Sequence, residues 1–304
     1  METAIKVSDL LKVYGSVRAV DEISFTIPRG EIFGMVGPNG AGKTTAIECI
    51  EGLRRPDGGS VRVLGLDPQR EPFALRERIG VQLQEAALPD RIKVWEALDL
   101  FASFYQEPAD WRPLLEALGL VEKRNSAVGK LSGGQRQRLF IALALVNEPE
   151  LVFLDELTTG LDPQARRAMW ELVRGIRERG ATVFLTTHFM EEAERLCDRV
   201  AIMDHGAIVA LDSPQNLIRT LGDERRVVLG VSGELDLALL QTLPGVTQVE
   251  QGNGHVTVSG VGDRLAGRVV GALEANDTPF NDLRVEGTTL EDVFLALTGR
   301  AMRD

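Results

Sequence analysis

A glycine-rich segment, GPNGAGKTT at positions 37–45, lies between an apolar run and a stretch of helix formers. It fits the spacing GxxxxGK[ST], in which the glycines let successive main-chain N–H groups turn towards phosphate oxygens. The following helix would direct its positive end at the same anion. Lys43 would reach the β- and γ-phosphates, and the Thr44 hydroxyl would coordinate Mg²⁺. The segment predicts a nucleoside triphosphate site rather than an ordinary turn, formed by Gly37, Pro38, Asn39, Gly40, Ala41, Gly42, Lys43, Thr44 and Thr45.

Two adjacent acids, Asp155 and Glu156, end the apolar run LVFLDE at 151–156. A carboxylate at a strand tip beside a phosphate-binding loop can complete the ligands of Mg²⁺, which suits Asp155. Glu156 points the other way and can polarise a water for in-line attack on the γ-phosphate. A solvated turn is the alternative for such a pair taken alone, but the phosphate-binding loop favours the catalytic interpretation.

A third segment, LSGGQRQR at 131–138, places Ser132 before two glycines and a helical stretch. Ser132 is predicted to cap that helix and leave main-chain N–H groups open at its start. This would be a second anion site without a lysine of its own. A plain serine-capped helix is the alternative for this segment.

Apolar β-branched runs and helical stretches alternate through the first 220 residues, which predicts an α/β domain with a largely parallel sheet. Residues 71–130 are rich in helix formers and predict a helical insertion. We expect strands at 31–37, 150–156 and 181–188, helices at 43–53, 163–180 and 189–200, and a hairpin at 201–212 that turns at His205–Gly206.

The pattern changes after residue 220, so we expect a boundary there between domains 1–220 and 221–304. The second region reads β-α-β-β-α-β followed by one more helix, a split-βαβ (ferredoxin-like) α+β pattern. In the last helix, Leu290, Val293, Phe294 and Leu297 share one face, which we interpret as a core face rather than a partner-binding face. The expected elements are strands at 225–231, 246–251, 255–260 and 280–286 and helices at 234–243, 263–276 and 289–299.

The composition excludes several classes of protein. The chain has 304 residues, 44% of them hydrophobic, and a net charge of −11, of which −6 lies in residues 221–304. The acidic balance argues against a nucleic-acid coat and a polybasic membrane anchor. No apolar run approaches the ~18 residues of a membrane span, and Cys49 and Cys197 form no metal or disulfide pattern. We therefore expect a cytoplasmic protein with no nucleic-acid partner.

The ordered set GPNGAGKTT, LSGGQRQR, LVFLDE, TGLD and TTH resembles the nucleotide-binding subunit of ABC transporters over about residues 3–220. The resemblance implies a P-loop NTPase cassette with a mixed sheet, and ATP rather than GTP as the nucleotide. It also implies a head-to-tail homodimer. The signature segment of one copy, with Ser132, Gly133, Gly134 and Gln135, would close over ATP held by residues 37–45 of the other.

The resemblance implies roles for four further residues. Tyr14 is similar to the aromatic residue that stacks on adenine, although a half-buried strand tyrosine is the alternative. Gln84 resembles the glutamine that contacts Mg²⁺ and the attacking water, with Gln82 left open as the alternative. His188 resembles the histidine that contacts the γ-phosphate and holds the catalytic glutamate. Asp162 resembles the residue that couples the two sites across the dimer.

Leu157 departs from the proline that usually follows the acid pair in this family, and we expect activity to survive the change. The resemblance implies a separate transmembrane permease, received by a groove in 71–130, and a position on the inner face of the cell membrane. The tail TLEDVFLALTG resembles that of the daunorubicin-resistance-type exporters and favours drug or antibiotic export. Two alternatives are a soluble ABC ATPase of translation or DNA repair and a regulatory module that binds ATP without hydrolysis.

Overall fold

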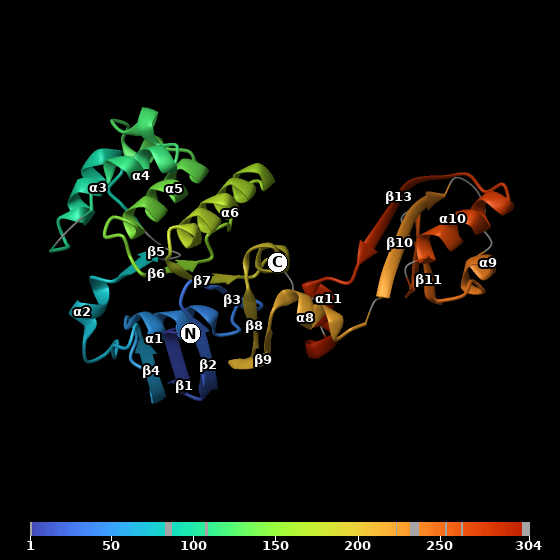
Figure 1. The fold of residues 1–304 in the computed structure, drawn as a ribbon, viewed down its shortest axis with the longest axis horizontal. Helices are drawn as coiled ribbons and strands as arrows, with labels where there is room; N and C mark the ends of the chain where they lie inside the picture. Colours follow the sequence, from blue (N-terminus) through green and yellow to red (C-terminus); the bar gives the residue numbers. More distant parts are fainter. Residues whose placement is uncertain are drawn as a thin grey trace. The chain divides into compact units, whose positions relative to one another are not determined.

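The computed structural model of the chain describes residues 2–82, 87–106, 109–222, 224–231, 237–252, 254–262 and 264–299. The chain forms two compact units, with the second beginning at Gln215 (Figure 1).

The first unit contains two sheets. A three-stranded antiparallel sheet has the order β2-β1-β4, with β1 at Thr3–Tyr14, β2 at Val17–Pro28 and β4 at Gly58–Val63. A six-stranded sheet has the order β5-β6-β7-β3-β8-β9, and every neighbouring pair is parallel except β8–β9. Its strands are β5 (Ile79–Gln82), β6 (Leu151–Asp155), β7 (Thr182–Thr187), β3 (Ile32–Val36), β8 (Arg199–Asp204) and β9 (Ala207–Asp212).

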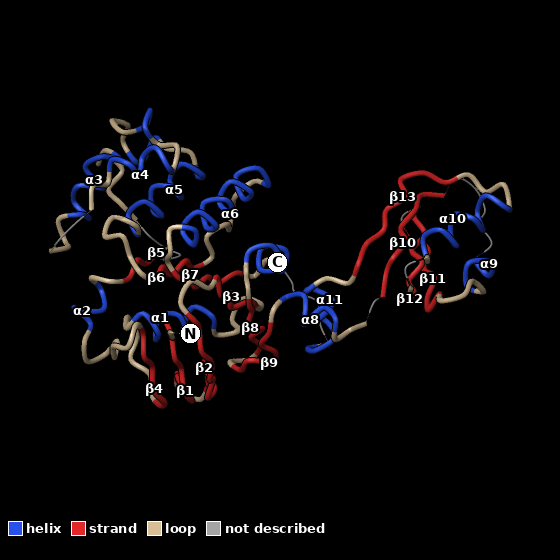
Figure 2. Tube along the Cα trace, in the orientation of Figure 1, coloured by secondary structure: helices blue, strands red, loops and turns tan. Residues whose placement is uncertain are grey.

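The helices of the first unit connect these strands. They are α1 (Lys43–Glu51), α2 (Pro72–Arg76), α3 (Val94–Ala102), α4 (Arg112–Ala117), α5 (Gly133–Ala144), α6 (Pro163–Glu178), α7 (Met190–Leu196) and α8 (Pro214–Arg219), the last of which spans the boundary with the second unit. Figure 2 shows α3, α4 and α5 grouped away from β1, β2 and β4. The strands and helices expected between 31 and 212 are confirmed. The structure also places a strand of the main sheet, β5, inside the helix-rich stretch 71–130.

Burial of the central strands of the main sheet explains why their sequences are apolar. Every residue of β3, β6 and β7 is buried, and strands covered on both faces need continuous apolar runs. On one face Phe33, Phe153 and Phe184 pack together, with ring centroids 5.5–5.8 Å apart between Phe184 and the other two. Because these three strands are parallel, their carboxyl ends meet at one edge of the sheet.

The second unit has the predicted β-α-β-β-α-β order followed by a helix. Its elements are β10 (Glu224–Val231), α9 (Leu237–Gln241), β11 (Val246–Gly252), β12 (His255–Val261), α10 (Leu265–Ala275), β13 (Phe280–Gly287) and α11 (Leu290–Thr298). The antiparallel sheet has the order β11-β12-β10-β13, the split-βαβ arrangement. One face of it packs on α9 and α10 through a small core that includes Val227, Leu229, Val256 and Val258.

Helix α11 agrees with the core-face interpretation at three of its four apolar positions. Leu290, Val293 and Phe294 are at most 1% exposed, whereas Leu297 is 49% exposed. Thr289 caps the helix, and the Asp292 carboxylate accepts hydrogen bonds from the Thr289 N–H and from Arg226 in β10. The last helix is therefore tied to the sheet of the second unit.

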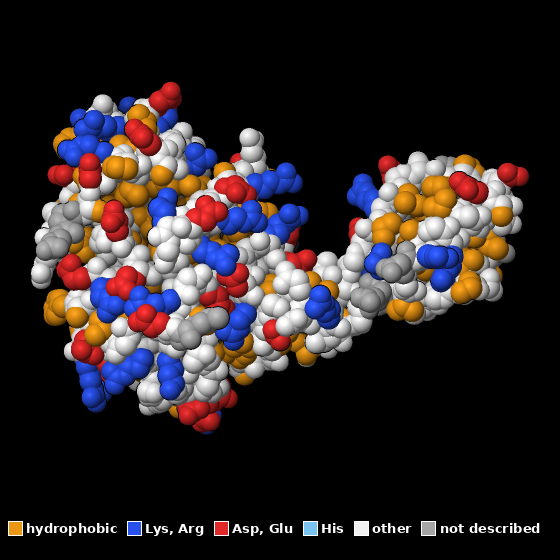
Figure 3. Space-filling model, viewed as in Figure 1, with side chains coloured by type: hydrophobic (Ala, Val, Ile, Leu, Met, Phe, Trp, Pro, Cys, Tyr) orange, Lys and Arg blue, Asp and Glu red, His pale blue; other side chains and the backbone are white. Residues whose placement is uncertain are grey.

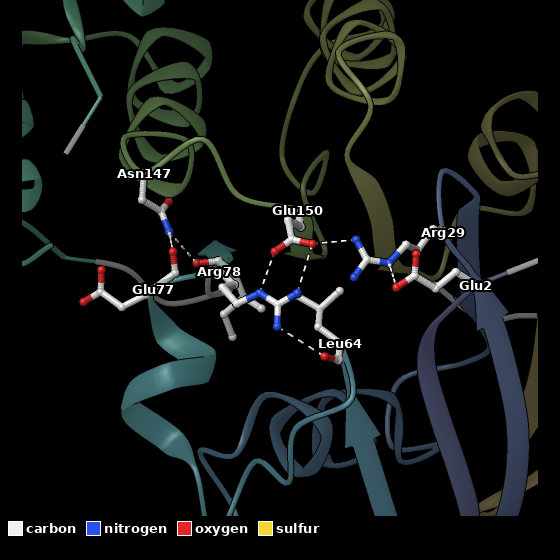
Figure 4. A network of polar contacts seen from close by, with 8 residues as sticks. Glu2, Arg29, Leu64, Glu77, Arg78, Asn147 and Glu150 are labelled. Atoms are coloured by element: carbon white, nitrogen blue, oxygen red, sulfur yellow. Dashed lines mark hydrogen bonds and ion pairs between the residues drawn. The ribbon is translucent and has the colours of Figure 1, made fainter. Parts of the chain in front are cut away.

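A polar network joins elements at the amino ends of the main-sheet strands (Figure 4). Glu150 accepts hydrogen bonds from Arg78 Nε and Arg29 Nη1, each at 2.5 Å. Arg78 also donates to the carbonyl of Leu64 at 3.3 Å. Asn147, just after α5, donates to the carbonyls of Glu77 and Ile79 at 3.1 Å. The network ties the antiparallel sheet and the end of α5 to the start of β5 and β6.

The surface of the first unit carries both signs of charge, which are mixed over the face seen in Figure 3. Among the residues that the structure describes, no helix combines the length and apolarity needed to cross a bilayer.

The network at Glu150 yields a stability prediction. Hydrogen bonds from Arg78 and then Arg29 lower the pKa of Glu150 in the folded state, although burial opposes them. Its stabilisation is therefore present above about pH 4.3, the usual glutamate pKa, and is lost as pH falls through the lower folded pKa. Glu150→Gln should reduce the free energy of unfolding at pH 7 by about 1 kcal/mol.

Denaturant unfolding of the cassette at pH 7 and at pH 3 measures this effect, and the difference from wild type should shrink at pH 3. Glu148→Gln is the matched control, because Glu148 is two residues away and has no ion pair among the described residues. An equal loss in both variants would contradict the role of the network.

Candidate functional site

The glycine-rich loop turns between the end of β3 and the start of α1. Gly42, the residue before α1, has φ = 104°, and a Cβ there would lie 2.1 Å from the carbonyl oxygen of Ala19. A Cβ on Gly37 would lie 2.1 Å from the carbonyl oxygen of Met203. Only glycine fits at either position. The loop therefore packs closely against β2 and β8, and the amino end of α1 stays open.

Lys43, the first residue of α1, lies inside this loop. Its side chain is 4% exposed, and Nζ donates to the carbonyl oxygens of Gly37 at 2.8 Å and Pro38 at 3.1 Å. Burial lowers the pKa of Lys43, whereas the nearby carboxylates of Glu156 and Asp155 raise it. The lysine is thus held beside the loop's main chain in a setting where a phosphate group would compensate its buried charge.

A hollow of about 330 Å³ opens in front of the loop. This volume is in the range of small-ligand sites. Six of the nine residues predicted to bind phosphate line it, together with Glu156, which approaches from the end of β6. The lining residues are Ala19, Asn39, Gly40, Gly42, Lys43, Thr44, Thr45 and Glu156.

Asp155 is the last residue of β6 and is 4% exposed. Its register partner on β7 is Thr186, whose hydroxyl donates a hydrogen bond to the Asp155 carboxylate. Burial raises the pKa of Asp155, and the bond from Thr186 lowers it. The role of Thr186 was not predicted from the sequence. The segment TTH at 186–188, together with parallel pairing of β6 and β7, could have indicated it.

Glu156 follows in the left-handed region, with φ = 49°. Its main-chain N–H donates to the carbonyl and the hydroxyl of Thr186, at 3.1 and 3.2 Å, which fixes this sparsely populated conformation. Glu156 Oε1 lies 3.5 Å from His188 Nδ1 and 3.8 Å from Lys43 Nζ. The hydroxyl of Thr159 donates to Glu156 Oε2 at 3.3 Å, a second contact that sequence reasoning missed. Leu157, at the position of the family proline, is 4% exposed.

The signature segment forms the amino end of helix α5, with Ser132 as its N-cap. Ser132 Oγ accepts the N–H of Gln135 at 3.3 Å, and the Gln135 side chain accepts the N–H of Ser132 at 3.1 Å. Ser132 and Gly133 are exposed. A Cβ on Gly134 would lie 3.7 Å from Ala165 near the start of α6. Asp162 caps that helix by accepting the N–H groups of Gln164 and Ala165 at 2.9 and 2.8 Å. None of these residues lines the hollow of their own chain.

The remaining predicted residues lie apart from the hollow or outside the described residues. Tyr14 is 43% exposed, and Lys12 Nζ and Arg54 Cζ each lie 5.5 Å from the centroid of its ring. Gln84 lies outside the described residues. Gln82, its alternative, is 4% exposed at the end of β5. The roles of Tyr14 and Gln84 stay predictions.

The oxygen donors present suit Mg²⁺. Thr44 supplies a hydroxyl beside the hollow, and Asp155 supplies a buried carboxylate whose charge a cation would stabilise. Hard oxygen donors of this kind, few in number and next to a phosphate site, are typical of Mg²⁺. Among the described residues there is no cluster of three or more His, Cys, Asp or Glu that could hold a metal without a phosphate ligand.

Comparison with known sequences gives one consistent result. Residues 20–159 match the family described as ABC transporter. The chain is 39% identical to the daunorubicin resistance ATP-binding protein DrrA3 of Streptomyces coeruleorubidus, over 98% of this chain and 96% of that protein. It is 40% identical to the Nod factor export ATP-binding protein I of Paraburkholderia xenovorans, over 100% of this chain and 99% of that protein.

Solved structures agree for the first unit. One described as an ATP binding subunit of an ABC transporter superposes with a TM-score of 0.66 at 30% identity, over 72% of this chain and 94% of that chain. Another, described as a dimeric bacterial ABC transporter cassette, gives a TM-score of 0.61 at 28% identity over 69% of this chain and 98% of that chain.

The contacts of Thr186 yield a prediction. Thr186→Val removes the hydroxyl that holds Asp155 and one acceptor of the Glu156 N–H, so we expect ATP turnover to fall by about tenfold or more. ATP affinity measured without metal should change little, because the phosphate-binding loop is untouched. Thr182→Val, on the same strand, is the control, since among the described residues Thr182 Oγ1 accepts the N–H of Gly30, which lies outside the hollow. Equal turnover in the two variants would contradict a positioning role for Thr186.

Proposed function

The chain belongs to the ABC transporter family as an ATP-binding subunit of the exporter type, and we propose that two copies close head to tail on two ATP molecules to drive a separate membrane permease. The ATPase activity follows from the family, and the arrangement of the copies is the proposed part. One observation carries it. The phosphate-binding hollow and the capped signature helix lie in one chain, yet no signature residue lines that hollow.

Two incomplete anion sites in one chain become two complete sites when two chains meet about a twofold axis. The exposed Ser132 and Gly133 at the start of α5 would then cover ATP held by the partner's loop. Exposed N–H groups at a helix start suit the γ-phosphate, because the helix dipole adds to them. The dimeric cassette among the structural relatives supports such a pairing.

The chemistry follows from the contacts around the hollow. Lys43 would exchange its loop carbonyls for β- and γ-phosphate oxygens. Glu156 would accept a proton from the attacking water, while His188, 3.5 Å from its carboxylate, holds it in place. Mg²⁺, when bound by Thr44 and Asp155, would neutralise charge on the phosphates. Because Thr186 holds the main chain of Glu156, the carboxylate would stay beside the hollow where the water attacks.

Three family positions complete the proposal. Tyr14 would stack on adenine, and its exposed ring leaves room for a base. Gln84 would contact the metal and the attacking water. Asp162 would report on the second site, since its cap fixes the start of α6 next to Gly134 of the signature helix.

Exposed apolar side chains on α2, on α3 and just after α3 support a permease as the partner. Phe73 is 80% exposed, Phe104 is 65% exposed and Leu100 is 44% exposed. The segment after α3 reaches the carboxyl end of α2, where the Gln106 N–H donates to Glu77 at 3.4 Å. We propose that a cytoplasmic helix of the permease docks on this surface, which would place the chain on the inner face of the cell membrane. The names of the relatives, daunorubicin resistance and Nod factor export, favour an exporter of the drug or antibiotic type.

Mixing two inactive variants tests the head-to-tail arrangement. Lys43→Ala disables the loop of one copy, and Ser132→Arg disables the signature of the other. In a mixed dimer both lesions fall on one site and leave the second site intact. We expect each variant alone to be inactive and the mixture to recover about a quarter of wild-type turnover, from half the dimers with one of two sites each.

The control mixture pairs Lys43→Ala with Glu156→Gln. Both lesions lie on the loop side, so each site of the mixed dimer is damaged and no activity should return. Glu156→Gln alone should retain ATP and accumulate as a closed dimer in gel filtration. Failure of the first mixture, or recovery in the control, would overturn the arrangement.

The docking surface gives a separate prediction. Phe73→Asp and Phe104→Asp should each reduce the permease recovered with the chain from membranes by about tenfold or more, as expected for apolar anchors. ATP binding by the purified chain should be unchanged. Val121→Asp, at a 53% exposed position after α4, is the control. Recovery equal to the control would exclude this surface as the docking site.

A further inference from the structure

The second unit ends its sheet with an uncovered strand. β13 is the outermost strand next to β10 (Figure 1), and all of its residues after Phe280 are exposed. Its outer main-chain N–H and C=O groups have no strand beside them in the part of the unit that the structure describes. Such an edge is a template for another strand.

The apolar side chains of β13 lie on the helix-covered face but extend beyond the helices. Val285 is the register partner of Val227, which is fully buried beneath α9 and α10. Val285 itself is 48% exposed, and Leu283, two residues earlier on the same face, is 37% exposed. The apolar face of the sheet therefore continues past its own core to the free edge.

The charged side chains of β13 lie on the opposite face, in alternating sign. Arg284 is the register partner of Val228, and Glu286 is the register partner of Arg226. Arg226 bonds to Asp292 of α11 instead. Within the described residues, neither the Arg284 nor the Glu286 side chain has a hydrogen bond or an ion pair.

We propose that β13 pairs antiparallel with β13 of a second copy of this chain, about a twofold axis centred on Val285. In that register Arg284 lies opposite Glu286 of the second copy, and the reciprocal pair forms on the other side of the axis. Val285 meets Val285 of the second copy, and each Leu283 lies diagonal to that pair. The two sheets would join into one.

Two features of the chain select this edge and this register. A register shift between Val228 and Gly230, with Asp282 at φ = 49°, bends the strand and limits the pairing to residues 283–287. The other edge, β11, has Glu250 and no basic residue. Pairing of β11 with itself would bring no opposite charges together, so β13 is the edge that complements its own copy.

Five residues of strand bury too little area for a stable dimer alone. The pairing therefore rests on the proposed cassette dimer, which would hold two second units at a high effective concentration. The contact would then connect the two copies outside their ATP sites.

A cysteine at the axis tests the register. In the full chain carrying Glu156→Gln, with ATP, Mg²⁺ and an added mild oxidant, Val285→Cys should form a disulfide between copies, because directly opposed residues have Cα atoms about 4.5–5.5 Å apart. Gln251→Cys on β11 is the matched control and should not cross-link. The native Cys49 and Cys197 are buried. Gel filtration of the same protein under reducing conditions reports the cassette dimer independently of the disulfide.

If the cassette dimer forms and Val285→Cys cross-links no better than the control, the pairing is overturned while the proposed function stands. If no cassette dimer forms, the proposed function fails, and the pairing is judged by Val285→Cys against the control in concentrated protein. Cross-linking above the control there supports it, and its absence overturns it.

Charge reversal tests the complementarity. In the Val285→Cys background, Arg284→Glu and Glu286→Arg should each slow cross-linking by about fivefold or more, since both place like charges opposite each other. The two changes alter the charge near the thiol in opposite directions, so a shared decrease cannot arise from thiol reactivity. The double variant should recover the original rate, and Glu250→Arg on β11 should have no effect. No recovery in the double variant would overturn the register.

Discussion

Three charged side chains are buried at the carboxyl ends of the main-sheet strands. Burying them costs desolvation free energy, and the surrounding residues of the cassette offset that cost with polar contacts. Lys43 and Asp155 are each 4% exposed, and the Glu156 side chain is 7% exposed. Buried charges are tolerated only with close polar partners. Two loop carbonyls hold the lysine, and Thr186 holds the aspartate and the main chain of the glutamate. The parallel order of β3, β6 and β7 brings these partners together.

The same constraint fits the proposed site shared between two chains, because no signature residue lines the hollow of its own chain. The buried face of the hollow is rigid, since its groups are held by main-chain bonds and by glycines that permit no Cβ. The signature helix is held by its own reciprocal cap, with Ser132 and Gln135 bonded to each other. Two rigid halves of this kind can meet across an interface without either being remodelled. In the proposed dimer, closure of the two copies would depend on ATP, because its phosphates supply the negative charge that both phosphate-binding halves attract.

Residue patterns predicted most of the central fold because local rules apply there. The buried strands read as continuous apolar runs, and α5, α6 and α11 begin at Ser132, Asp162 and Thr289, which all act as caps. The long strands β1 and β2 and the short strand β5 were not predicted. Their pairing depends on distant partners and, in β1 and β2, on several register shifts. The roles of Thr186 and Thr159 likewise needed the register of β6 against β7 and the turn after Glu156.

The acidic excess of the second unit bears on how two copies could meet. A net charge of −6 on residues 221–304 opposes the approach of an identical unit at long range. That repulsion is screened beyond about 8 Å at physiological salt. At contact distance the local pattern decides, and residues 283–287 of β13 carry one cation and one anion two residues apart. Global charge can thus keep free chains separate, whereas a neutral, self-complementary edge allows pairing once the cassettes hold two units together.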